Sequence, residues 1–152
     1  GGNVAAVAAQ LARDNGGPAL KGQLLLTPVT DGSKAYPSLN DNAEGYMLTR
    51  SLMNWFWDHY ADTAQRSDPK ASPLKAASLA GLPPTTIVTA QFDPLRDEGE
   101  AYGKALQAAG VPTRIEQFDG MNHGFFFFVG IVDKSGTAMD SACEWVRETL
   151  AE

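Results

Sequence analysis

The sequence has only one cysteine among its 152 residues. A single thiol excludes an intrachain disulfide and a cysteine-rich zinc site. Cys143 falls in the helical pattern Met139, Cys143, Val146, so we expect it to pack as a core thiol. Histidine is also scarce, and His59 and His123 lie too far apart for an HExxH-type pair. The sequence therefore predicts no metal site and no cofactor.

Basic clusters and long apolar runs are missing as well. A net charge of −6 without a run of Lys or Arg argues against a nucleic-acid partner. No apolar stretch approaches the roughly 20 residues of a membrane-spanning helix. No signal peptide is visible, which favours a cytoplasmic location. The length and the 43% apolar content instead predict one soluble domain with its own core.

Three apolar stretches predict buried strands, at residues 23–29, 85–90 and 113–118. The first is a continuous apolar run, which is typical of a strand buried on both faces of a parallel sheet. A helical stretch at 97–109 connects the second strand to the third and ends at Gly110, which completes a strand–helix–strand unit. We therefore predict an α/β fold with about three parallel strands and flanking helices.

Helices are also predicted near both ends of the chain. In residues 3–15 the side chains of Val4, Val7, Ala8 and Leu11 share one stripe. This helix starts after two glycines rather than after a capping Ser, Thr or Asp, so we expect a truncated beginning. The last helix covers residues 137–151. Its expected apolar face consists of Met139, Cys143, Val146 and Leu150.

Residues 31–82 fit the alternation of strands and helices less well, and we expect them to form an insertion over an apolar pocket. Residues 46–60 read as a helix with more large apolar side chains than one buried stripe needs. We expect the substrate-facing side chains to be Met47, Leu52, Trp55 and Phe56. His59, on the same helix, is expected to have a surface or packing role.

Asp93 and His123 are the candidate chemical groups. Each lies just beyond a predicted strand, and the carboxyl ends of neighbouring parallel strands meet at one edge of a sheet. An acid there can hold the tautomer of an imidazole whose other nitrogen acts as a general base. The alternative for Asp93 is a loop cap before Pro94. Phe125, beside the histidine, is expected either in the core or in the wall of a substrate pocket.

Three further acids compete with Asp93 as the partner of the histidine. Asp97 and Glu98 fall in a first helical turn, where a negative charge suits the helix dipole. Asp119 reads as a solvated turn residue. We expect structural roles for all three.

The motifs resemble those of the hormone-sensitive-lipase-like branch of the α/β-hydrolases. Gly1-Gly2-Asn3 resembles the tail of its G-D-S-A-G-G-N nucleophile elbow, and residues 23–31 resemble the strand and loop that follow. The D-P-L-R-D-E-G run at 93–99 resembles the catalytic-acid motif, and G-M-N-H-G-F at 120–125 the catalytic-histidine motif. The resemblance covers essentially the whole chain, in the order of that fold.

This resemblance implies that the chain is the C-terminal portion of a carboxylic ester hydrolase. It implies that Asp93 is the triad acid, His123 the base, and that the serine lies two positions before Gly1. The H-G-G-G oxyanion loop is also absent, and no serine of the chain stands in G-x-S-x-G. We expect a small-molecule ester as substrate. We also expect a complementary N-terminal fragment or a second copy beside the uncharged edge at Leu24-Leu25-Leu26.

Two other functions stay open at this point. The chain could be a catalytically silent fragment that only binds or associates, or it could belong to a lactone- or peptide-cleaving α/β-hydrolase.

Overall fold

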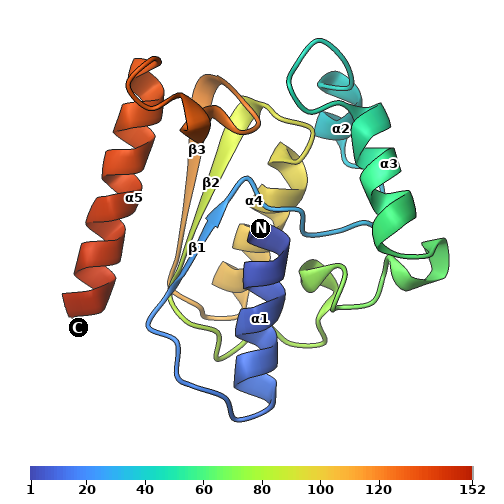
Figure 1. Ribbon diagram of the computed structural model, residues 1–152. Helices are drawn as coiled ribbons and strands as arrows, with labels where there is room; N and C mark the ends of the chain where they lie inside the picture. Colours follow the sequence, from blue (N-terminus) through green and yellow to red (C-terminus); the bar gives the residue numbers. More distant parts are fainter. Residues whose placement is uncertain (152) are drawn as a thin grey trace.

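The computed structural model describes residues 1–151 as a parallel three-stranded sheet with helices on both faces (Figure 1). The strands are β1 (Gln23–Leu26), β2 (Thr85–Phe92) and β3 (Thr113–Asn122). The α-helices of this part of the chain are α1 (Gly2–Asp14), α2 (Pro37–Asp41), α3 (Arg50–Tyr60), α4 (Arg96–Ala108) and α5 (Asp133–Ala151). The predicted α/β architecture of about three parallel strands with flanking helices is confirmed.

The order of the strands in the sheet is β1-β2-β3. Leu25 pairs with Ile87, and Ile87 pairs with Ile115, so all three strands run in the same direction. The carboxyl ends of β2 and β3 are therefore neighbours. Within the described residues β1 is paired on one side only, so it forms an edge of the sheet.

Side chains from alternate strand positions enter two separate cores. On one face Leu25 and Ile87 pack with Ala6 of α1 and with Tyr102 and Leu106 of α4. On the other face the buried residues are Val88, Ala90, Phe125 and Ala138. In Figure 1, α5 lies on this second face, while α1 and α4 lie on the opposite one together with α2 and α3. The central strand β2 is thus buried on both sides, as its apolar run predicts, and β1 alternates between buried and partly buried residues. The prediction is wrong for β3, where no residue is fully buried, because this strand forms the outer edge of the sheet.

Several element boundaries differ from the sequence prediction. β1 ends at Leu26 instead of residue 29, because Thr27 has a φ of +42° and Pro28 has no N–H for the ladder. α3 begins at Arg50 instead of residue 46, because the Thr49 side chain accepts the Leu52 N–H and caps the helix there. The strands β2 and β3 are longer than predicted, and α5 starts at Asp133 instead of residue 137.

The expected stripe of α1 does not face the sheet. Val4 is 61% exposed and Leu11 is 40% exposed, whereas Ala6, Ala9 and Gln10 are buried. The small alanines let the helix axis approach the sheet closely, which side chains of valine and leucine at those positions would prevent. One face of α1 thus lies against β1, and its larger apolar groups are left in solvent.

The last helix also rotates away from its predicted face. α5 buries Ser135, Ala138 and Ala142, while Leu150 is 65% exposed. Cys143 is only half-buried. Among residues 1–151, no helix combines the length with the apolar character that crossing a membrane requires.

Candidate active site

Asp93 directly follows the last residue of β2 and is almost completely buried, with 1% of its surface exposed. Its Oδ1 accepts the backbone N–H of Leu95 at 2.8 Å. This bond holds the side chain in an Asx turn and leaves Oδ2 free to point at another group. Oδ2 lies 2.9 Å from Nδ1 of His123.

His123 directly follows β3, so two adjacent strand ends bring acid and base together. Its side chain is 28% exposed, whereas that of Asp93 is 1% exposed. An ionised carboxylate only accepts hydrogen bonds, so Nδ1 carries the proton and Nε2 keeps its lone pair. The pair is thus arranged for an imidazole that accepts a proton at Nε2.

The loop after the histidine depends on Gly124. This residue has a φ of +77°, and a Cβ there would approach the Sδ of Met47 to 3.3 Å. A left-handed backbone suits glycine, and here the space is also limited. The tight turn sends the chain into the 3₁₀ helix Phe125–Phe128 and leaves His123 at its start.

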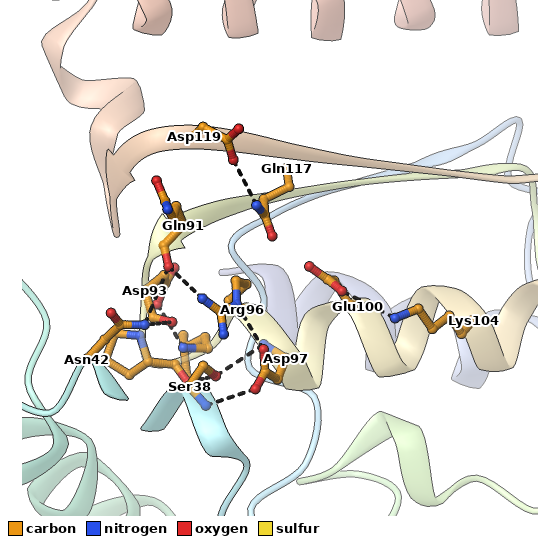
Figure 2. Close-up of polar contacts among 12 residues, drawn as sticks. Ser38, Asn42, Gln91, Asp93, Arg96, Asp97, Glu100, Lys104, Gln117 and Asp119 are labelled. Carbon is orange, nitrogen blue, oxygen red and sulfur yellow. Dashed lines mark hydrogen bonds and ion pairs between the residues drawn. The ribbon is translucent and has the colours of Figure 1, made fainter. Parts of the chain in front are cut away.

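The competing acids are occupied elsewhere. The Oδ2 of Asp97 accepts the N–H of Ser38 at 2.8 Å, and its Oδ1 pairs with Arg96 at 2.8 Å (Figure 2). Asp119 is exposed on β3, where it accepts a bond from Gln117. Asp97 thus bonds to the start of α2 and to its neighbour Arg96, and not to His123.

Glu98 is the acid whose environment the sequence does not reveal. It is 7% exposed, and its Oε1 accepts the N–H of Thr30 at 2.7 Å and that of Asp31 at 3.3 Å. Burial is the main cause that raises the pKa of Glu98, to about 8 in all; the charges of Asp31 and Asp93 add to the rise, and the two N–H bonds oppose it. Burial acts to raise the pKa of Asp31 too, yet hydrogen bonds from Ser33, Tyr36 and Lys75 hold it below its ordinary value.

The raised pKa of Glu98 makes the protein less stable as the pH rises. Between its ordinary value of 4.5 and about 8, the folded protein keeps a proton that the unfolded chain has released. This contribution to the free energy of unfolding is complete below about pH 4.5 and is lost above about pH 8. Glu98→Gln is expected to flatten the profile, since it imitates the protonated acid. Urea unfolding between about pH 5 and about pH 9 measures this.

Glu100→Gln, on the same helix, is the matched control and is expected to leave the profile unchanged. Parallel stability curves for the wild type and Glu98→Gln would contradict the assignment.

A cavity of about 820 Å³ opens beside His123. The start of α1 lines it together with Leu24 and Leu26 of β1, and Phe126 and Phe127 line it after the histidine. From α3 it receives the side chains of Met53, Phe56, Trp57, His59 and Tyr60. The base thus stands at the wall of a mostly apolar space large enough for a small organic molecule.

Of the side chains expected to face substrate, only Phe56 lines this cavity. Leu52, Trp55 and Met47 do not belong to its lining, and Trp55 and Met47 are more than half exposed. Four of the five residues of α3 that line the cavity, 53, 56, 57 and 60, form one helical stripe. His59 lines it from the side of the helix that also carries residues 52 and 55. This stripe was readable in the sequence, but the direction in which it faces was not.

Of the two positions expected for Phe125, core or pocket wall, the structure has the core position. Its side chain is 1% exposed and packs in the core with Val88, Ala90 and Ala138. The 3₁₀ turn directs the first phenylalanine inward, while Phe126 and Phe127 reach the cavity. Residues 1–151 contain no cluster of three or more His, Cys, Asp or Glu side chains suited to a metal ion.

Comparison with known proteins gives consistent matches. The model of the alpha/beta hydrolase fold family matches residues 1–127. Carboxylic ester hydrolase LipN of Mycobacterium tuberculosis is 43% identical over 145 residues, which are 90% of this chain and 39% of LipN. Esterase LipI of the same organism is 39% identical over 152 residues, which are 99% of this chain and 48% of LipI.

Solved structures agree with these matches. A thermostable esterase from Pseudomonas putida ECU1011 superposes with a TM-score of 0.89 at 47% identity, covering 93% of this chain and 46% of that one. The thermophilic carboxylesterase EstE1, cloned from a metagenomic library, superposes with a TM-score of 0.94 at 42% identity, covering 99% and 52%. This chain spans about half the length of these relatives.

Proposed function

The chain belongs to the α/β-hydrolase fold family, in its hormone-sensitive-lipase-like branch, and on that premise we propose that it carries the acid and the base of a carboxylic ester hydrolase. The observation that supports this most is the 2.9 Å contact between Asp93 Oδ2 and His123 Nδ1 beside a largely apolar cavity. The relatives are named as ester hydrolases, and the chain matches about half of each.

The proposed reaction uses a serine that precedes Gly1 in a longer protein. His123 Nε2 takes the serine proton as the serine oxygen attacks the ester carbonyl. The imidazolium then protonates the leaving alcohol, and an acyl-enzyme remains. Water repeats the sequence through the same histidine, which releases the acid and restores the serine. Asp93 holds the proton on Nδ1 throughout and stabilises the imidazolium.

The cavity and the segment 31–82 are proposed to receive the apolar part of the ester. The side chains Met53, Phe56, Trp57 and Tyr60 form one wall, and Leu24 and Leu26 form another. This composition favours an uncharged substrate. We propose that residues 31–82 act as the insertion that shapes the pocket. A cytoplasmic location stays a prediction from the sequence.

A complementary N-terminal segment is the proposed partner of this chain. β1 has an unpaired edge within the described residues, and the cavity reaches the first residues of α1. Val4 and Leu11 of α1 are exposed nearby. An apolar edge of this kind pairs readily with another strand. A second copy of the chain is the competing occupant.

One experiment tests both function and partner. The 152-residue chain alone is expected to leave p-nitrophenyl esters intact, since none of its serines stands in G-x-S-x-G. Co-expression with the segment encoded before Gly1 is expected to restore hydrolysis, and sedimentation of the mixture is expected to show a one-to-one complex. Turnover by the lone chain that His123→Ala abolishes would contradict the proposal. Cleavage of lactones or peptides but not esters would assign another chemistry.

A further inference from the structure

We propose that Ser38 and Asn42, at the short helix α2, are positioning residues for Asp93. They touch neither the imidazole nor the cavity, but they hold the turn that aims the carboxylate at His123. The inference rests on the proposed catalytic role of Asp93. No feature of the sequence near residue 40 predicts it, since the two segments lie more than 50 residues apart.

Asn42 binds the acid's own backbone. Its Nδ2 donates to the carbonyl oxygen of Asp93 at 3.3 Å and to that of Gln91 at 3.4 Å. The residue is only 4% exposed, so its amide has little access to water. Figure 2 shows Asn42 directly beside Asp93, at the end of β2. The Asn42 amide thus links the backbone of Gln91, near the end of β2, to that of Asp93, just after the strand.

Ser38 fastens the following part of the same turn. Its Oγ donates to the carbonyl oxygen of Pro94 at 2.8 Å and accepts the N–H of Asp97 at 3.2 Å. In return, the N–H of Ser38 donates to Asp97 Oδ2 at 2.8 Å. Ser38 is fully buried. These reciprocal bonds join the starts of α2 and α4, and each satisfies a helix-terminal N–H that lacks a partner within its own helix.

Arg96 and Gln91 tie this cluster to the strand of the base. Arg96 donates to the carbonyl oxygen of Gln91 at 2.9 Å and pairs with Asp97 at 2.8 Å. The Oε1 of Gln91 accepts the N–H of Gly120 on β3 at 2.7 Å. The residues on both sides of Asp93 are therefore held relative to the strand that ends at His123. Figure 2 shows the two bonds of Arg96.

The consequence is geometric. Asp93 Oδ1 is held by Leu95 N–H within the turn, so the direction of Oδ2 follows the orientation of the whole turn. Loss of the Ser38 or Asn42 contacts frees this turn to rotate. A shift of about 1 Å in a catalytic group can cost about 100-fold in rate. Residues 42–49 connect α2 to α3, whose side chains line the cavity.

The test uses the full-length protein with Ser38→Ala and Asn42→Ala. Each is expected to lower kcat by about 10- to 100-fold and to change KM by less than about twofold. Each is also expected to shift or broaden the downfield proton NMR resonance of the His123 Nδ1–H. Asn40→Ala, at an exposed position of α2, is the control and is expected to change neither. Ser38→Thr keeps the hydroxyl and is expected to restore most of the rate.

Circular dichroism checks that each variant folds. Asp97→Asn is a milder variant, because its amide oxygen can still accept the Ser38 N–H. Folded Ser38→Ala and Asn42→Ala proteins with normal kcat and an unchanged resonance would overturn the inference. The NMR measurement also distinguishes the positioning role from the proposed ester hydrolysis, because the resonance is observed without any substrate. If the wild type cleaves no ester yet the resonance moves in Ser38→Ala, the proposed function fails while the positioning role stands.

Discussion

Replacing Asp93 with asparagine is expected to lower kcat for ester hydrolysis by about 10³- to 10⁴-fold in the full-length protein. The carboxylate accepts a hydrogen bond from the Nδ1–H of His123 at 2.9 Å. An asparagine can turn its NH₂ group toward Nδ1, which moves the imidazole proton to Nε2. The nitrogen that should accept the serine proton would then be occupied. Steady-state kinetics with a p-nitrophenyl ester measure the loss.

Asp119→Asn is the matched control, since this acid lies on β3 near the site but is exposed and bonded to Gln117. It is expected to change kcat by less than about twofold. Because Asp93 is buried, its variant must also be shown to fold. A folded Asp93→Asn protein with nearly full activity would remove Asp93 from the proposed triad, and an equal loss in both variants would indicate a general effect of charge.

Phe125→Ala is expected to lower the free energy of unfolding by about 3–5 kcal/mol. The ring is 1% exposed and packs in the core with Val88, Ala90 and Ala138. Truncation removes buried apolar surface and leaves a cavity that the neighbouring strand cannot fill. Urea unfolding of the full-length protein, followed by tryptophan fluorescence, measures the change.

Phe127→Ala is the control in the same 3₁₀ turn, because this side chain is 85% exposed. It is expected to change stability by less than about 0.5 kcal/mol. The pair of variants also separates core from pocket. If Phe125→Ala raised KM and left stability unchanged, the ring would belong to the substrate pocket, against its burial in this structure.

Local signals in the sequence were enough for the sheet and for the approach of Asp93 to His123. An uncharged apolar run such as Leu24-Leu25-Leu26 reports a strand covered on both faces, whatever lies around it. Asp93 follows the buried strand β2 and His123 follows β3, and parallel strands joined by one helix place their ends side by side. The approach of these two residues therefore follows from order along the chain.

The face that each helix turns inward was not available from periodicity. α3 has more large apolar side chains than one stripe holds, so several stripes satisfy the same pattern, and the one with Met53, Phe56 and Tyr60 faces the cavity. In α1 the close approach to β1 favoured Ala6 and Ala9 over Val4 and Leu11. In both helices the inward face is set by packing against a neighbouring surface, and the sequence of the helix alone does not describe that surface.

By itself the sequence determined the parallel sheet, its helices and the acid and base at neighbouring strand ends, because strand burial and helix periodicity are local properties of the chain. Only the tertiary structure decided the contacts of Ser38 and Asn42 with the turn of Asp93, and the burial of Glu98 against Thr30. These contacts join segments more than 50 residues apart. These hydrogen bonds form only because the fold places α2 and α4 side by side. The identity of a polar side chain does not indicate which distant residue it will bond.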